Sequence, residues 1–263
     1  MNKTIVLIFT ILTLAAATFA ANLANPAAQV GDARLAFGAS YYLGGADITD
    51  YKIPMMMNRI GGRVSFSPVR YANIGVDFGS AQVSVDRYVY TIGPPDTIPL
   101  FDGNFGWFAG GHLKLSSPYI AGYVSAMVLG SVTYFRSAND HEAHYAGLDI
   151  TAAGGPQIRI QNIGLFISLG PQLYLIDGKN KGDDKVTNNY SNVNNMRAWI
   201  ALDYFPKEVP LTWNYKPYVS VEFTASPKIG GSKRTPIREF SLSFSMGATS
   251  QRLYGQDSGD DFE

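Results

Sequence analysis

Hydrophobic and polar residues alternate along most of the chain. Between Leu35 and Leu43 every second residue is apolar, and the residues between them are small or polar. Successive side chains of a β-strand point to opposite faces, so this period of two predicts a strand with one apolar face. The same alternation returns at 59–66, 73–78, 104–115, 148–159, 165–175, 196–204, 218–224 and 239–246. The pattern therefore predicts an all-β fold.

The segment from Tyr119 to Phe135 is apolar on both faces, so the pattern leaves its orientation open. With this segment the chain has about ten predicted strands, and eight and twelve are the alternative counts. Many of the strands run to about ten residues or more, whereas strands of soluble proteins usually have ~5–6. A tilted strand that crosses a membrane needs ~9–11 residues. Strand length therefore favours a membrane protein.

The predicted connections alternate between short and long. The short ones are 67–71, 116–118 and 161–162, and the long ones are 45–57, 87–102, 136–146, 177–194 and 226–235. Short periplasmic turns and longer external loops are typical of outer-membrane barrels.

A soluble sandwich or lipocalin-like barrel is the competing interpretation of the same alternation, with the apolar faces turned inward. Three features favour the membrane. The polar faces are rich in Gly, Ser and Ala rather than in charge, the apolar faces are nearly unbroken, and a soluble sandwich does not require the asymmetry in loop length.

From Ala33 to about Ser250 the chain resembles the bacterial outer-membrane β-barrels. The alternating residues Phe240, Leu242, Phe244, Met246 and Ala248 resemble the last strand of such proteins, which the insertion machinery reads. The chain departs from that pattern where Arg252 interrupts the alternation and the acidic segment 256–263 follows. The resemblance implies a single antiparallel barrel that contacts outer-membrane lipid, lipopolysaccharide and the insertion machinery.

The N-terminus has the features of a secretory signal. Lys3 precedes an apolar run at 5–14, and Thr18 and Ala20 place small residues at the cleavage positions. An uncleaved anchor helix is the alternative, but its apolar run is barely long enough to span. We predict a signal peptide at 1–20, an irregular periplasmic lead at 21–32, the barrel at 33–250 and an acidic tail at 251–263. The expected location is the outer membrane of a Gram-negative-type bacterium.

Composition excludes several classes of function. The chain has 21 Lys and Arg and 21 Asp and Glu, so it lacks the basic excess of a nucleic-acid binder. It has no cysteine, which rules out disulfides, thiolate metal sites and cysteine nucleophiles.

The densest polar cluster runs from Asp140 to His144. Its His-Glu-x-His spacing differs from the His-Glu-x-x-His that places two imidazoles on one helix face. We therefore interpret the cluster as an external loop, with adventitious Zn²⁺ or Cu²⁺ binding as the alternative.

An omptin-like protease would use paired acids and a histidine near the outer rim. The residues available for that role are Asp140, His141, Asp149, Asp183 and Asp184. Their spacing does not require the role. We predict no catalytic, cofactor-binding or metal-binding residues and no enzyme activity.

Charged residues recur on the predicted polar faces. They are Arg34, Arg63, Asp77, Lys114, Asp149, Arg159, Arg197, Asp203, Glu222 and Glu239. Because ten strands enclose little free space, we expect these side chains to fill the lumen as an ion-pair network.

The predicted function is a structural or interaction scaffold that presents external loops. The alternatives are a small pore and a barrel-embedded hydrolase, either an omptin-like protease or a lipid hydrolase with a Ser-His-acid set.

Overall fold

The structure is a computed structural model. It describes residues 34–48, 53–69, 71–86, 88–89, 97–98, 100–140, 143–181, 185–206, 215–225 and 240–250. No helix within these ranges is long and apolar enough to cross a membrane. The predicted signal peptide, periplasmic lead and acidic tail lie outside the described residues.

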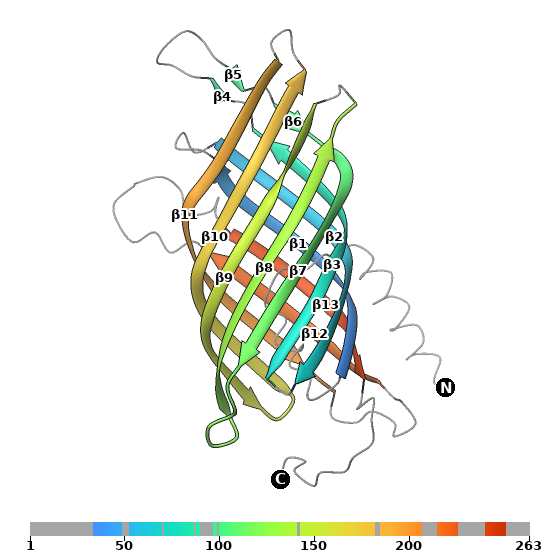
Figure 1. Cartoon of the computed structure of the whole chain (residues 1–263), viewed down its shortest axis with the longest axis vertical. Coiled ribbons are helices and arrows are strands. Elements are labelled where there is room, and N and C mark those ends of the chain that lie inside the picture. The colour runs from blue at the N-terminus through green and yellow to red at the C-terminus, as the bar shows by residue number, and fades with distance from the viewer. Residues whose placement is uncertain are drawn as a thin grey trace.

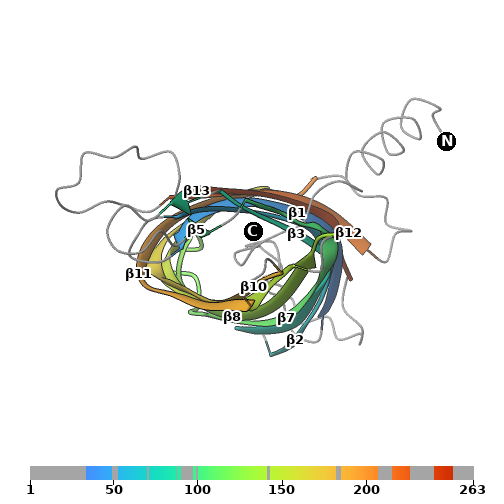
Figure 2. The same cartoon turned by 90° about the horizontal axis from the view of Figure 1, so that it is seen from above.

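Ten long strands form one closed antiparallel barrel (Figures 1 and 2). They are β1 (Arg34–Ile48), β2 (Ile53–Val69), β3 (Ala72–Val85), β7 (Asn104–Ser116), β8 (Val124–Ala138), β9 (His144–Ile160), β10 (Ile163–Lys181), β11 (Lys185–Tyr204), β12 (Tyr215–Ala225) and β13 (Phe240–Ser250). Three two-residue strands, β4 (Tyr88–Val89), β5 (Thr97–Ile98) and β6 (Phe101–Asp102), lie between β3 and β7. The all-β barrel of about ten strands that the alternation predicts is confirmed.

The first and last strands close the barrel. β1 pairs with β13 from Ala36 opposite Thr249 to Gly44 opposite Ser241. The Leu35 amide also donates a hydrogen bond to the Ser250 hydroxyl at 2.9 Å. The beginning of β1 and the end of β13 therefore lie at the same end, as an even number of antiparallel strands requires.

The strands are staggered, and the stagger sets the width of the barrel. The directly opposite residues can be followed from strand to strand around the wall. Gly44 on β1 is opposite Ser241, Ser241 is opposite Thr224, and Thr224 is opposite Trp199. A path that continues in this way around the whole barrel returns to β1 about twelve residues closer to the beginning of that strand. For ten strands this stagger corresponds to a tilt of roughly 40° and a backbone radius of about 10 Å. Large inward side chains can fill such an interior.

The apolar faces point outward, as predicted. Phe37 on β1, Leu169 on β10 and Ile200 on β11 have exposed fractions of 43%, 58% and 52%. The structure also settles the orientation of β8, on which Val128 faces outward and Met127 is buried inside. The exterior thus carries an apolar band around the wall, as a lipid-facing surface requires.

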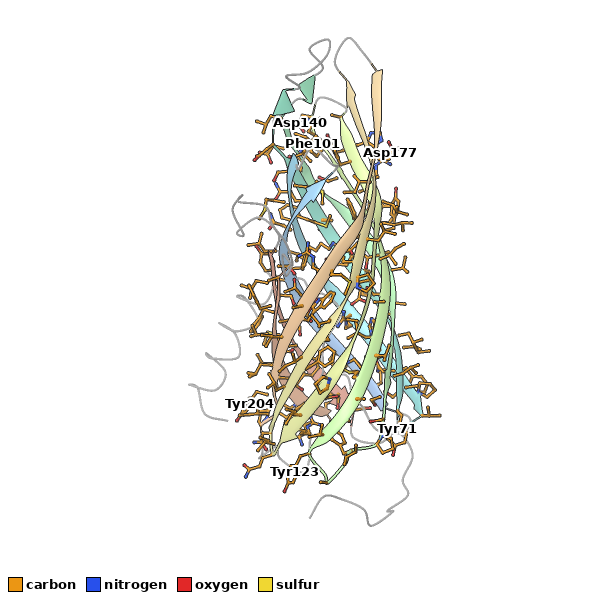
Figure 3. The ribbon with its side chains drawn as sticks, turned by 90° about the vertical axis from the view of Figure 1, so that its left-hand side faces the viewer. Tyr71, Phe101, Tyr123, Asp140, Asp177 and Tyr204 are labelled. Atoms are coloured by element: carbon orange, nitrogen blue, oxygen red, sulfur yellow. The ribbon has the colours of Figure 1, made fainter. Side chains whose placement is uncertain are left out.

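Tyrosines mark one edge of this band. Tyr71, Tyr123 and Tyr204 lie at the same end of the barrel, opposite the end that carries Asp140 and Asp177 (Figure 3). At the other edge, Trp107 packs against Tyr134 with ring centroids 5.2 Å apart. Amphipathic rings at both edges of an apolar band are typical of membrane–water interfaces.

The polarity of the wall reverses near the outer end, which the sequence analysis did not predict. On β3 the outward residue Phe78 is 51% exposed, whereas the next outward residues are Ser80, Gln82 and Ser84. The inward residues between them, Ala81, Val83 and Val85, are each 0% exposed. Above the band the wall therefore has a polar exterior and an apolar interior, like that of a soluble barrel.

The reversal explains why several predicted loop boundaries were wrong. Strands β1 and β2 extend to Ile48 and Ile53, inside the predicted loop 45–57, and β10 and β11 extend to Lys181 and Lys185, inside 177–194. The predicted loop 136–146 likewise contains the ends of β8 and β9. These segments pair in antiparallel hairpins beyond the apolar band, so their backbone groups are satisfied by the neighbouring strand. The turn predicted at 116–118 is longer, because β8 begins only at Val124.

Candidate functional site: the filled lumen

Most of the charged residues predicted on the polar faces are buried inside the barrel. These are Arg63, Asp77, Lys114, Asp149, Arg197, Asp203 and Glu222. Arg159 is half-buried near the end of β9, and the side chains of Arg34 and Glu239 lie outside what the structure describes. Their inward direction follows from the period of two of each strand.

An apolar cluster of buried side chains lies at the outer end of the lumen. We call it the outer plug, and its buried residues are Tyr42, Met55, Met57, Ala81, Val83, Val85, Phe101, Phe108, Phe135, Ala143, Tyr145 and Ile176. The Phe101 and Tyr145 rings pack with their centroids 4.5 Å apart, and both side chains are 0% exposed. Sequence reasoning missed the plug, although its signal was present in the inverted alternation from Ser80 to Val85.

Arg59 on β2 joins the outer plug to the polar residues below it. Its guanidinium lies 5.2 Å from the centroid of the Tyr42 ring, and the Phe108 and Phe135 rings are at 5.9 Å and 5.6 Å. Its Nη2 donates a 2.8 Å hydrogen bond to Asp149 Oδ2. The side chains of this ion pair are 1% and 3% exposed. A buried charge-assisted pair of this kind fixes the relative positions of β2 and β9.

Asp149 is held from a second side as well, because Gln172 Nε2 on β10 donates a 2.8 Å hydrogen bond to its Oδ1. Asp140, by contrast, is exposed at the outer end and accepts a 2.7 Å hydrogen bond from Asn104. The structure does not bring these two acids together. The other candidates for the protease role, His141, Asp183 and Asp184, lie outside the described residues.

A second ion-pair group lies lower in the lumen. Asp77 on β3 accepts a hydrogen bond from Arg63 Nε through Oδ1 and pairs through Oδ2 with His112 Nδ1 at 2.8 Å. Gly75 lies directly between Ser65 and His112 in the strand registers, and a side chain on it would clash with the imidazole. The missing side chain therefore makes room for His112.

Ser65, His112 and Asp77 together have the residue types of a hydrolase triad. Ser65 Oγ and His112 Nε2 are both buried, and neither has a hydrogen-bond partner in the described part of the chain. The serine oxygen therefore makes no bond to the imidazole nitrogen that would act as its base, and it lies within the packed interior. The contacts that the group does make are those of Asp77 with Arg63 and His112.

A smaller apolar group, the inner cluster, lies on the β8–β11 side of the lumen. It consists of Met127, Leu129, Ala153, Phe166, Trp199 and Ala201. Trp199 is 1% exposed and Phe166 is 0% exposed. The lumen thus contains large packed side chains both in the outer plug and in the wall below it.

The described residues contain no group of three or more His, Asp or Glu side chains that would hold a metal ion. His144 begins β9, whereas His141 and Glu142, the central residues of the predicted polar cluster, lie outside the described residues.

No protein-family model matches the chain, and no curated protein matches its sequence. The solved structures similar to it include the following three. The translocator domain of the autotransporter NalP from Neisseria meningitidis is 11% identical, with a TM-score of 0.44, over 85% of this chain and 90% of that one. The outer membrane protease OmpT from Escherichia coli is 10% identical, with a TM-score of 0.39, over 83% and 94%. The CymD monoaromatic hydrocarbon channel is 8% identical, with a TM-score of 0.37, over 88% and 92%.

The architecture of the chain follows from its strand pairing and from which side chains point inward or outward, and it does not depend on these similarities. The wall is closed and antiparallel, its exterior carries an apolar band, and charged residues are buried inside it. This chain has the architecture of an outer-membrane β-barrel.

Proposed function

We propose that the chain is an outer-membrane barrel with a closed lumen that serves as a scaffold for its outer rim. The observation on which this proposal rests is the outer plug. Its buried residues other than Ala143 come from eight strands, β1, β2, β3 and β6 to β10, and they pack together in a lumen that is only about 10 Å in backbone radius. Water and ions would have to displace packed apolar side chains to pass, and the ion pair between Arg59 and Asp149 anchors the base of the plug.

The apolar band supports the membrane location. In this proposal a cleaved signal peptide directs the chain out of the cytoplasm, the insertion machinery folds it into the outer membrane, and lipid and lipopolysaccharide surround the band. The polar exterior above the band then projects from the membrane, where β10 and β11 form the longest hairpin described. This rim is the surface available to a partner outside the cell. The proposed scaffold has no enzyme activity.

Conductance in planar lipid bilayers tests the closed lumen. The purified protein is expected to insert without stable conductance steps. The double variant Phe101→Ala, Phe135→Ala removes two buried rings from the outer plug and is expected to conduct.

The matched control is the double variant Phe37→Ala, Phe78→Ala, which removes two outward rings that are 43% and 51% exposed. It is expected to remain closed, because it leaves the lumen unchanged. Stable conductance by the unaltered protein would contradict the proposal and would favour the small pore.

A further inference from the structure

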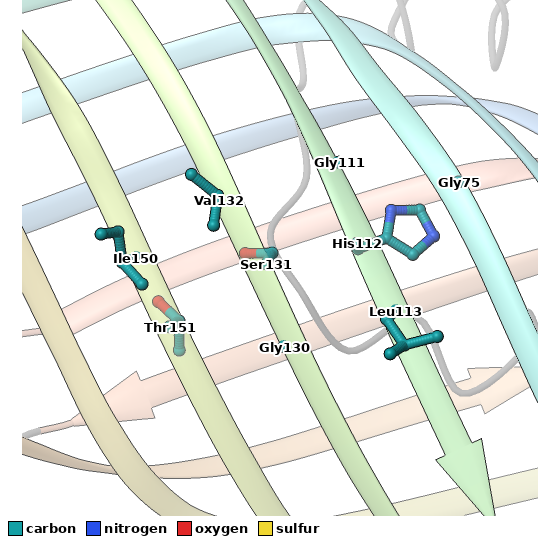
Figure 4. A pocket seen from close by; sticks show the side chains of 9 residues that line it. All are labelled: Gly75, Gly111, His112, Leu113, Gly130, Ser131, Val132, Ile150 and Thr151. Atoms are coloured by element: carbon teal, nitrogen blue, oxygen red, sulfur yellow. The ribbon is translucent and has the colours of Figure 1, made fainter.

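The outward face of β7, β8 and β9 has a hollow in the apolar band (Figure 4). The volume of this groove is about 530 Å³. Gly111 and Gly130 lie in its lining, together with the aliphatic residues Leu113, Val132 and Ile150. Each glycine is directly opposite a large residue, Gly111 opposite Val132 and Gly130 opposite Leu113, so the hollow is bounded on several sides.

The two glycines are not required by packing within the barrel. A Cβ atom on Gly111 would meet only the Gly75 carbonyl oxygen, at 3.5 Å, and one on Gly130 would meet only the Thr151 carbonyl oxygen, at 3.7 Å. These are ordinary contacts. At Gly79 and Gly155, by contrast, a Cβ atom would clash with the backbone of the neighbouring strand.

A glycine inside a strand weakens the strand, and in many proteins it marks a place where a ligand approaches the backbone closely. Positions 111 and 130 face outward in the middle of the apolar band, between Trp107 and Leu115 on β7 and between Val128 and Tyr134 on β8. The small outward residues Ala109 and Ala152 lie next to them and extend the hollow, and large outward residues such as Leu113 and Val132 border it. Because nothing inside the barrel accounts for the small residues, the explanation lies outside the wall.

We propose that this groove binds one acyl chain of a membrane lipid. The groove lies within the surface that contacts hydrocarbon, and its aliphatic side chains can make van der Waals contacts with a chain of methylene groups. A second barrel is a poorer occupant, because two convex walls meet along a line and leave a hollow between them unfilled. The inference rests on the membrane location in the proposed function.

A phospholipid with a diazirine near the middle of one acyl chain tests the site in vesicles of phosphatidylcholine. After illumination, mass spectrometry of peptides compares labelling of β7 and β8 with labelling of β10 and β11, whose outward residues include Leu169 and Ile200. We expect labelling at the groove to exceed labelling of β10 and β11, because an acyl chain seated in the hollow makes van der Waals contacts on several sides.

Gly130→Leu fills the groove from a position with room for a Cβ atom, and it is expected to remove the excess labelling. The control is Ala198→Leu, which places the same side chain at an outward position of β11 and should leave the excess unchanged. Equal labelling of all outward strands, or an excess that persists in Gly130→Leu, would overturn the acyl-chain site while leaving the membrane location intact. Absence of label from every outward strand would contradict the membrane location itself.

A second copy of the chain is tested separately with Leu113→Cys. The protein has no other cysteine, so a disulfide between copies in vesicles would report contact at the groove. Efficient dimer formation through this cysteine would overturn the lipid site, and a monomer supports it.

Discussion

Arg197 on β11 donates a 3.1 Å hydrogen bond from Nη2 to the carbonyl oxygen of Gly45 on β1. Arg197 comes one residue beyond Ala198, which forms the outermost described pair of β11 with β12. Gly45 comes one residue beyond Gly44, which forms the outermost described pair of β1 with β13. The bond therefore spans two strands and links β11 directly to β1. We infer that Arg197 helps to close the wall where it leaves the apolar band.

Replacing Arg197 by Met should lower the free energy of unfolding by about 1–3 kcal/mol, because the buried Gly45 carbonyl loses its donor. Urea unfolding followed by tryptophan fluorescence in detergent measures the change. Arg136→Met is the control, since Arg136 is exposed on the outside of β8, and it should change the stability by less than about 0.5 kcal/mol. Equal effects of the two substitutions would argue against the role of Arg197.

The ion pair between Arg59 and Asp149 should show strong coupling in a double-mutant cycle. Each single variant, Arg59→Met or Asp149→Asn, leaves a buried group without its partner and should cost about 3–5 kcal/mol. The double variant should cost less than the sum, with a coupling energy of about 0.5–3 kcal/mol. Additive effects in denaturant unfolding would show that the two side chains do not interact.

The edge of the apolar band can be located with arginine substitutions. Leu169→Arg should destabilise the barrel by about 2–4 kcal/mol, because the charge would face hydrocarbon near the middle of the band. Gln82→Arg should cost no more than about 1 kcal/mol, since the outward residues of β3 are polar at that level. Folding into vesicles at a series of urea concentrations gives both values, and a similar cost at both positions would place the edge of the band elsewhere.

Ser168→Arg tests whether the lumen is filled at the level of the inner cluster. Ser168 is directly opposite Trp199, and their exposed fractions are 3% and 1%. Overpacking should therefore cost about 1–3 kcal/mol or more. The same unfolding measurement tests this, and a fully tolerated arginine would show free space where the structure has packed side chains.

Accessibility on intact cells tests the topology. An epitope inserted beside Lys181, at the end of β10, should bind antibody on intact cells, and one placed after Asp257 should bind only after the outer membrane is opened. The reason is that ten antiparallel strands bring the start of β1 and the end of β13 to one side. Exposure of the second epitope on intact cells would show that the barrel is inverted.

The division of each alternating strand into two faces was available from the sequence, because strand geometry sends successive side chains to opposite faces whatever the strand pairs with. The outward positions of Phe37, Ile200 and Leu242 and the inward position of Arg63 follow from local alternation. The number of strands followed from counting the alternating segments. The candidate site was predictable only as a set of inward charges.

Tertiary structure decided which inward residues meet and how far the strands extend. Arg59 and Asp149 are 90 residues apart, and their contact depends on the stagger of the barrel, which no local pattern specifies. The alternation from Ser80 to Val85 was present in the sequence, but an alternation does not say which of its two faces is inside. Closure of the wall determined that the apolar face becomes the outer plug. The division of side chains between two faces is a property of a single strand, whereas the choice of the inner face and the filling of the lumen are properties of all ten strands together.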